Sequence, residues 1–244
     1  MLSPFRRGAI RLGGWLQRQS DRLYFRAAGG KARPVFFDTD RTLPELRVVD
    51  ENVDAIREEL LAILPRKEQI PRYHEVDGRQ STISAEGNGS WGTFFVCMYG
   101  VGERLPNRSL CPRTVEVVER IPGLIQAFFS ILDAKKCVPA HDGPHHYYLR
   151  YHTGLIVPRE RPPRIRVKDR YYTWKERESV LFDDSWNHEV TNEADSERVV
   201  LIVDVARPRP WYLRALLLLA FRISLLGVQE HEWGDVVERA RAKV

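Results

Sequence analysis

The chain has 244 residues, of which 43% are hydrophobic and 29% are charged. This composition excludes a disordered or fibrous protein, and the length suits one large domain or a core with appendages. The 38 basic and 33 acidic residues leave a formal net charge of +5, which permits an anionic partner without requiring one. No apolar run reaches the roughly 18 residues of a standard membrane-spanning helix.

Residues 1–30 form a basic segment in which large apolar residues such as Phe5, Trp15 and Leu23 are interspersed with six arginines. Two interpretations stay open for this amphipathic pattern. It is typical of a helix in a membrane interface, with apolar side chains down and arginines among lipid headgroups. It is equally typical of a helix packed on the domain, or of a partly disordered tail.

Helices dominate the predicted elements up to residue 131. Apolar residues at helical spacing predict a helix over 44–64, ended by Pro65. Residues 77–91 are rich in Gly, Ser and Asn and predict a loop, and the aromatic and β-branched residues of 93–99 predict a strand. Two further helices are predicted over 113–120 and 124–131, on either side of the turn at Pro122 and Gly123.

From Cys137 to Ala206, short β-rich runs alternate with turn residues. The runs predict strands over 146–156, 164–167, 171–174, 179–182, 188–190 and 198–205. Short strands at this spacing favour an antiparallel sandwich or barrel. Because the helices come first and the strands second, we expect a mainly β fold buttressed by N-terminal helices.

Residues 211–228 are the most apolar stretch and carry only Arg214 and Arg222 as charges. A helix of this length would reach about 27 Å, which is marginal for crossing a bilayer. The two arginines are eight residues apart and so lie on a similar face. The stretch is interpreted as a helix lying in a membrane interface or, nearly as readily, as a helix whose leucines pack on the β-core.

Two histidines stand out among the candidate site residues. His152 lies in the predicted strand 146–156, and His188 begins the strand 188–190. Histidines from separate strands of a small barrel can converge in its mouth, where neutral imidazoles suit Fe(II). Arg198 starts the next strand, and an arginine inside an apolar barrel needs an anion such as a carboxylate. Spacing alone, however, favours structural histidines and a surface arginine.

Residues 91–208 resemble the aspartyl/asparaginyl β-hydroxylase family of 2-oxoglutarate-dependent dioxygenases. The similar segments occur in the family's order and spacing: Trp91-Gly92-Thr93-Phe94-Phe95, Ile121-Pro122-Gly123-Leu124, Phe128-Phe129-Ser130-Ile131-Leu132, His141-Asp142-Gly143-Pro144, Leu149 to Pro158, Phe182 to Val190 and Arg198 to Asp204. The resemblance implies a double-stranded β-helix core of the jelly-roll, cupin-like type. It also implies C–H hydroxylation with Fe(II), 2-oxoglutarate as cosubstrate and O2.

The resemblance further implies roles for individual residues. His152 and His188 would be the catalytic metal ligands, without the carboxylate that most iron oxygenases add at the position of Gly154. Arg198 would pair with a 2-oxoglutarate carboxylate. Arg166 and His141 are similar to residues that face the cosubstrate pocket. Asp183 and Asp184 are expected to shape the turn before His188, and Asp184 alternatively to orient that histidine.

The segments Ile121 to Leu124, Phe128 to Leu132 and Leu149 to His152 look most like the bacterial branch that hydroxylates lipid A acyl chains. We therefore expect a lipid or acyl-chain substrate, which also favours the interfacial interpretation of residues 211–228. Two alternatives stay open: hydroxylation of aspartyl or asparaginyl residues or a related peptide natural product, and a non-enzymatic β-barrel binding module.

The sequence also predicts where the protein acts and how it is organised. Three cysteines with no C-x-x-C pair indicate reduced thiols, and no secretory signal opens the chain. We expect a cytoplasmic protein, peripheral on the inner face of the membrane, with no nucleic-acid partner because its basic residues are dispersed. The expected organisation is a basic segment over 1–30, a dioxygenase domain over 31–210 with its β-core at about 91–208, and an apolar helix and tail over 211–244.

Overall fold

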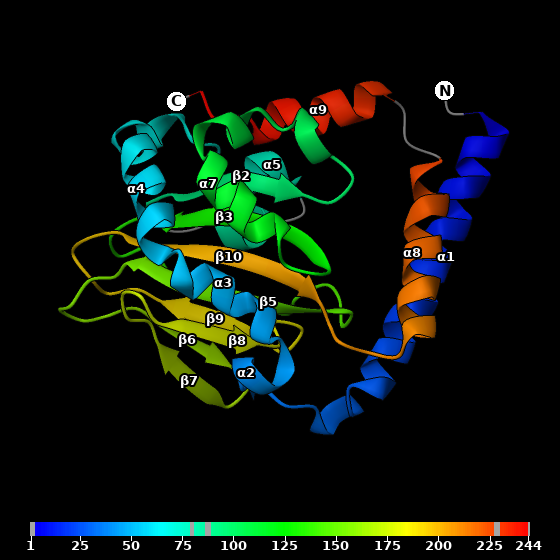
Figure 1. The fold of residues 1–244 in the computed structure, drawn as a ribbon, viewed down its shortest axis with the longest axis horizontal. Helices are drawn as coiled ribbons and strands as arrows, with labels where there is room; N and C mark the ends of the chain where they lie inside the picture. The colour runs from blue at the N-terminus through cyan, green and yellow to red at the C-terminus, as the bar shows by residue number, and fades with distance from the viewer. Residues whose placement is uncertain (1–2, 79–80, 86–88, 227–229, 244) are drawn as a thin grey trace.

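The computed structural model describes residues 3–78, 81–85, 89–226 and 230–243. Two sheets form its centre, with helices around them, so the mainly β architecture with flanking helices is confirmed (Figure 1). The larger sheet has the strand order β1-β8-β5-β10-β3-β2, and the smaller has the order β4-β9-β6-β7. Every pairing between the described strands is antiparallel.

The strand boundaries lie close to those that the sequence predicts. The larger sheet consists of β1 (Phe36–Phe37), β2 (Trp91–Met98), β3 (Leu124–Leu132), β5 (Tyr148–Ile156), β8 (Ser179–Phe182) and β10 (Arg198–Ala206). The smaller sheet consists of β4 (Val138–His141), β6 (Arg164–Val167), β7 (Arg170–Thr173) and β9 (His188–Thr191). All seven predicted strands are confirmed, with small shifts at their ends, whereas β1 and β4 were not predicted.

The α-helices are α1 (Pro4–Ala27), α2 (Thr39–Thr42), α3 (Arg47–Glu51), α4 (Val53–Ile63), α5 (Tyr73–Val76), α6 (Ser81–Ser84), α7 (Pro112–Glu119), α8 (Trp211–Leu225) and α9 (Glu230–Ala240). The helix predicted over 113–120 is confirmed as α7. The helix predicted over 44–64 is helical but breaks at Asn52, between α3 and α4. The loop predicted over 77–91 contains α6 and ends where β2 begins, and residues 79–80 and 86–88 lie outside the described part.

The helix predicted over 124–131 is wrong, because these residues form β3 between β10 and β2. From Ala127 to Leu132 the strand is buried on both faces. Its apolar residues therefore run on without alternation, and such a run does not distinguish a strand from a helix. Gly123, at φ 80°, makes the turn before the strand, where its carbonyl accepts the N–H of Ala206 on β10 at 2.8 Å.

Both faces of the larger sheet are buried, since successive side chains of a strand point to opposite sides. One face packs Tyr151 and Val203 against the apolar sides of α3, α4 and α7. The other face packs Phe128 and Ile202 against apolar residues of the smaller sheet, such as Val190. The second core therefore lies between the two sheets, which confirms the jelly-roll type of core.

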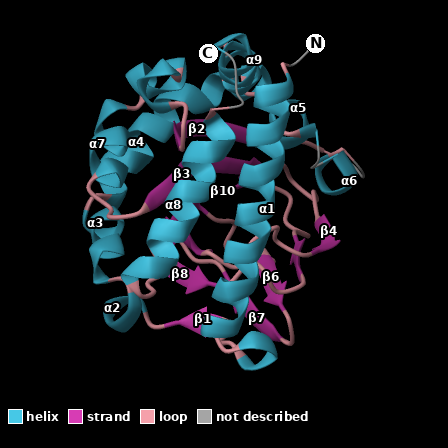
Figure 2. Cartoon of the chain, turned by 90° about the vertical axis from the view of Figure 1, so that its right-hand side faces the viewer, coloured by secondary structure: helices cyan, strands magenta, loops and turns pink. Residues whose placement is uncertain are grey.

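Helices α1 and α8 lie side by side and run in opposite directions at one end of the sheets (Figures 1 and 2). Tyr24 of α1 and two leucines of α8, Leu213 and Leu217, form a small core with Tyr147 and Tyr148. The segment 1–30 is thus mainly a helix packed on the domain, and α8 buries one side of its leucine-rich surface. Within the described residues, no helix combines the length and apolarity needed to cross a membrane.

Asn107 ties the C-terminal residues to the core. Its buried side chain donates to the carbonyls of Phe95 at 3.0 Å and Ala240 at 2.8 Å, and it accepts the N–H of Ala242 at 2.9 Å. Within the segment 211–244 that the sequence assigns to a helix and tail, the end of α9 is therefore linked to β2 through Asn107.

We predict that Asn107→Ala lowers the free energy of unfolding by about 2–4 kcal/mol, because three buried backbone groups lose their partner. Chemical denaturation of the two proteins measures the difference. Ser109→Ala is the control, since this exposed hydroxyl donates only to the Pro106 carbonyl in the same turn. An unchanged midpoint for Asn107→Ala would contradict the proposed tether.

Candidate functional site

His152 and His188 reach the interior between the sheets from different strands. His152 lies on β5, opposite Ile202 of β10 and Val180 of β8. His188 opens β9 on the smaller sheet, opposite Val167 of β6. The side chains are 5% and 4% exposed. Both rings are therefore buried in the interior, and burial is the largest cause that lowers the pKa of each.

The imidazole of His152 is buried without a polar partner. Neither of its ring nitrogens has a hydrogen bond. Its ring stacks on Trp174 at a centroid distance of 5.8 Å and meets Phe182 edge-on at 4.9 Å. Burial, and then the charge of Arg150, lowers the pKa of His152 well below its usual value. The ring is therefore neutral, aromatic-packed and able to ligate a metal.

His188 is oriented by its own chain. Its Nδ1–H donates to the Trp186 carbonyl at 2.9 Å, which leaves Nε2 with the lone pair that metal ligands need. Burial and the neighbouring His141 lower the pKa of His188 to about 3. The two rings lie 4.1 Å apart, because His141 of β4 pairs with His188 in the sheet.

Arg198 is the third inward-facing polar residue. It starts β10, is 2% exposed, and its Nε and Nη1 have no hydrogen-bond partner. Its guanidinium lies over the Trp174 ring at 4.7 Å from the centroid, and burial lowers its pKa to about 9. A buried guanidinium without an anion is costly, so this position favours a carboxylate ligand.

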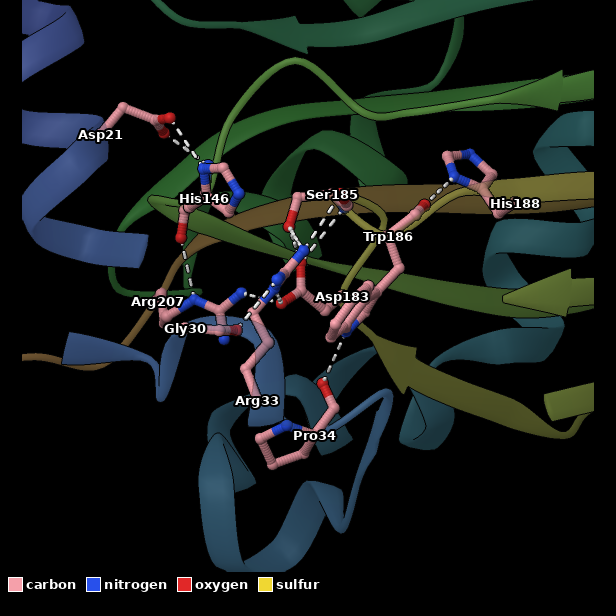
Figure 3. Close-up of polar contacts among 10 residues, drawn as sticks. All are labelled: Asp21, Gly30, Arg33, Pro34, His146, Asp183, Ser185, Trp186, His188 and Arg207. Carbon is pink, nitrogen blue, oxygen red and sulfur yellow. Dashed lines mark hydrogen bonds and ion pairs between the residues drawn. The ribbon is translucent and has the colours of Figure 1, made fainter. Parts of the chain in front are cut away.

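The turn before His188 is fixed by a buried ion cluster centred on Asp183 (Figure 3). Oδ2 of this carboxylate accepts from Arg33 at 3.0 Å and from Arg207 at 2.5 Å. Its Oδ1 accepts from the backbone N–H of Ser185 at 3.1 Å and from the hydroxyl of Ser185 at 2.5 Å. Asp183 therefore shapes the turn, as the sequence predicts, but two distant arginines hold it.

The same cluster is connected to His188 through Trp186. The Arg33 guanidinium lies 3.6 Å from the centroid of the Trp186 ring, whose Nε1–H donates to Pro34. The carbonyl of Trp186 is the acceptor for His188. Contacts thus run from the segment after α1 to the ring of His188 (Figure 3).

A second buried network lies beside the site. Arg150 forms a two-pronged pair with Asp204 at 2.7 and 2.8 Å and contacts Asp184 at 3.2 Å. Tyr148 donates to Asp184 at 2.9 Å, and Gln126 donates to Asp204 at 2.7 Å. Burial raises the pKa of Asp184 to about 7, although Arg150 lowers it. Two carboxylates thus share one guanidinium.

A cavity of about 380 Å³ opens next to these residues. Arg150, Asp184, Asp204 and His141 are among its polar lining residues, and the remaining lining mixes apolar side chains such as Trp91 and Ile125 with further polar ones. His141 contacts the His188 ring, and Arg150 is two residues from His152 on the same face of β5. The cavity therefore lies next to the two histidines, although neither of them lines it.

Gly154 leaves no room for a carboxylate ligand. A Cβ at this position would collide with the backbone carbonyl of Lys175. Its N–H and carbonyl are also bound to the segment that contains Glu178 and Arg177. Packing therefore accounts for a glycine where most iron oxygenases carry their acidic ligand.

The structure brings together His152, His188, His141 and Arg198 but places Arg166 elsewhere. Ile165 and Val167 point inward from β6, so Arg166 points outward, where it pairs with Glu189 at 2.7 Å and bonds Asn187 at 2.9 Å. This outer-surface position corrects the expectation that Arg166 faces the cosubstrate pocket.

Several functional side chains were missed from the sequence. Trp174 is fully buried in the core, where it contacts both His152 and Arg198. Arg33 and Arg207 lie far from His188 in the chain, so no local pattern marks them. A signal was available only for Arg150, which lies two residues before His152 in a predicted strand.

The residues present fit a metal ion and an anionic cosubstrate. His152 offers two unpartnered nitrogens, and Arg198 offers two unpartnered donors in the same interior. Within the described part of the chain, no group of three or more His, Cys, Asp or Glu side chains is arranged to hold a metal. The candidate protein ligands for an ion at this site are His152 and His188.

The chain is similar in sequence to known hydroxylases. The family model for aspartyl/asparaginyl beta-hydroxylase matches residues 50–208. An ornithine lipid ester-linked acyl 2-hydroxylase of Rhizobium tropici is 39% identical over 176 residues, covering 72% of this chain and 61% of that protein. The human aspartyl/asparaginyl beta-hydroxylase is 30% identical over 196 residues, covering 77% of this chain and 24% of that protein. The chain thus spans less than two thirds of the length of either relative.

Among solved structures, a cupin 2 conserved barrel domain protein from Salinispora arenicola aligns with 55% of this chain and 86% of its own. The TM-score is 0.33 and the sequence identity is 7%. The family model, in contrast, covers well over half of the chain and includes both histidines and every strand except β1. The chain belongs to the aspartyl/asparaginyl β-hydroxylase family.

Proposed function

We propose that the protein hydroxylates a C–H bond in the acyl chain of a lipid, using Fe(II), 2-oxoglutarate and O2. The observation that carries this proposal is a set of unpartnered polar groups in one buried place. They are the ring nitrogens of His152 and the Nε and Nη1 of Arg198. Buried polar atoms are rarely left unpaired unless a ligand completes them.

His152 and His188 would hold the iron, and Arg198 would hold the far carboxylate of 2-oxoglutarate. Bound Fe(II) supplies the oxidation of a C–H bond by O2, coupled to the conversion of 2-oxoglutarate into succinate and CO2. The chain contributes neutral imidazoles, kept so by burial, and a tautomer of His188 fixed by the Trp186 carbonyl. Trp174 holds the planes of His152 and Arg198 in place.

An acyl chain is favoured as the substrate by two observations. Identity to the acyl 2-hydroxylase of Rhizobium tropici is higher, at 39%, than identity to the human β-hydroxylase, at 30%. Apolar side chains of α1 and α8 also lie exposed, and the buried sides of these helices pack on Tyr147, which lines the cavity. The cavity of about 380 Å³ holds only part of a lipid, so the reacting segment and its polar linkage would enter while the remaining chain stays outside.

Hydroxylation of an aspartyl or asparaginyl side chain is the second candidate. It is favoured by the polar lining residues of the cavity, where Arg150 could meet a substrate carboxylate.

Succinate release separates the candidates. The protein, Fe(II) and 2-oxoglutarate are incubated with acylated amino lipids or with Asp- and Asn-containing peptides. Lipid-dependent succinate supports the proposal, and peptide-dependent succinate supports the second candidate. No release with either substrate would leave a non-enzymatic binding module as the better interpretation.

We predict that His152→Ala and His188→Ala each abolish Fe(II) binding while the protein stays folded. Each removes one of two protein ligands, so the loss cannot be compensated within the site. Anaerobic titration calorimetry measures the affinity. His74→Ala is the matched control, because its ring bonds Ser84 rather than reaching the site. Wild-type metal affinity in either variant would refute the ligand assignment.

We predict that Arg198→Ala raises the KM for 2-oxoglutarate about tenfold to several-hundredfold, the worth of a charged hydrogen-bonded pair. Arg198→Lys should recover part of this, since a point charge replaces a fork. Arg166→Ala is the control and should leave the KM unchanged, because its partner is Glu189 on the surface. A raised KM in Arg166→Ala together with an unchanged KM in Arg198→Ala would show that Arg166, and not Arg198, contacts the cosubstrate.

We predict that Gly154→Ala and Gly154→Asp lose similar stability, on the order of 2–4 kcal/mol, because the added Cβ meets the Lys175 backbone. Neither variant should bind Fe(II) more tightly than the parent. Thermal unfolding and metal titration of the pair test this. Tighter iron binding by Gly154→Asp alone would show that position 154 faces the metal.

A further inference from the structure

We propose that α1 and α8 together form a docking surface for an anionic phospholipid bilayer. We name it the α1–α8 surface: the sides of α1 (Pro4–Ala27) and α8 (Trp211–Leu225) that do not face each other or the core. Figure 2 shows the two helices side by side across the face turned to the viewer. The inference concerns how the protein meets a membrane and goes beyond the reaction at the histidines.

The first observation is the close packing that leaves these sides exposed. Gly13 and Ser20 of α1 and Ala220 of α8 are buried, which suits two helices that approach closely through small residues. Tyr24 of α1 and Leu213 and Leu217 of α8 are buried where the two helices pack on the domain. Several other large apolar side chains of α1 stay exposed.

The second observation is an exposed apolar stripe on α1. Phe5, Leu12 and Leu23 are 71%, 50% and 40% exposed. They are seven and eleven residues apart, close to two and three whole helical turns, so they share one side of the helix. Exposed apolar groups gathered in this way mark an interaction site rather than ordinary surface.

Indole rings lie at both helices. Trp15 of α1 and Trp211 of α8 are 51% and 80% exposed. Tyr212 next to it is also exposed. Aromatic rings with one polar edge are favoured at the level of lipid headgroups.

Charge identifies the partner. Helix α1 carries six arginines and one acidic residue, Asp21, and α8 carries two arginines and no acidic residue. Asp21 is engaged by the backbone and ring of His146. Arg11, Arg18 and Arg22 are exposed and, seven and four residues apart, line the side next to the apolar stripe. Apolar groups flanked by cations suit acyl chains beneath anionic phosphates.

The α1–α8 surface is also joined to the cavity. Tyr24 of α1 meets Tyr147 edge-on at 6.4 Å, and Tyr147 lines the cavity. Ile125, another lining residue, packs on the same small core as Leu213 and Leu217. A bilayer on this surface would therefore lie beside the cavity entrance. The idea that the bilayer delivers the substrate rests on the proposed function, whereas the binding of the protein to the bilayer does not.

Vesicle sedimentation of the full chain tests the proposal without measuring turnover. Vesicles of phosphatidylglycerol and phosphatidylcholine are compared with vesicles of phosphatidylcholine alone. The charge variant carries Arg11→Gln, Arg18→Gln and Arg22→Gln, and the apolar variant carries Phe5→Gln, Leu12→Gln and Leu23→Gln. Glutamine keeps the helix propensity high, and circular dichroism confirms folding.

The matched controls change the same kinds of residue on another surface. Arg159→Gln, Arg164→Gln and Arg170→Gln remove three exposed arginines around the smaller sheet, and Tyr171→Gln removes an aromatic side chain there that is 64% exposed. We expect the parent and both controls to sediment with anionic vesicles, and the α1 variants to partition at least about tenfold less. Phosphatidylcholine alone should retain little protein.

Three outcomes would overturn the proposal. The first is a parent protein that stays in the supernatant with anionic vesicles, and the second is controls that lose binding as much as the α1 variants. The third is a stable dimer by light scattering that the apolar variant dissociates while no variant alters sedimentation, which would assign the surface to a second copy of the chain. Quenching of Trp15 and Trp211 fluorescence by brominated lipids, lost in Trp15→Phe and Trp211→Phe, gives a second readout.

Discussion

The buried carboxylate of Asp183 is the constraint on which the candidate site depends. It joins Arg33, which follows α1, to Arg207, which follows β10, and it closes the turn that carries His188. A buried charge is tolerated only when it is paired and fully hydrogen-bonded, and removing one partner of such a cluster costs several kcal/mol. The position of one proposed metal ligand is thus coupled to the packing of both flanks of the barrel.

Several buried charges in the described interior are paired, although Asp184, Arg207 and Arg209 each keep one unpartnered polar atom. Arg150 is matched by Asp204 and Asp184, and Asp183 is matched by two arginines. On the same face of the larger sheet, His152 of β5 and Arg198 of β10 keep unpartnered polar atoms. Because unpaired buried polar groups are costly, their concentration at one place indicates a site built for ligands rather than for stability.

The sequence predicted most of the fold because β5, β6, β7, β8, β9 and β10 are β-rich runs bounded by turns. It failed at β3, where burial on both faces removes the alternation that identifies a strand. His152, His188 and Arg198 were found through family resemblance, since spacing alone favoured structural roles. The position of Arg166 was predicted wrongly, although alternation along the strand places it on the side opposite to the buried Ile165 and Val167. Arg33, Arg207 and Trp174 reach the site through long-range contacts, which leave no local pattern in the sequence.

A crystal structure grown without oxygen, with Mn(II) in place of Fe(II) and with 2-oxoglutarate, tests the central claim most directly. We expect the metal to bind one ring nitrogen each of His152 and His188, with no third side-chain ligand, and a carboxylate of 2-oxoglutarate to pair with Arg198. A metal held by other side chains, or a cosubstrate carboxylate that leaves Arg198 unpaired, would contradict the proposed site.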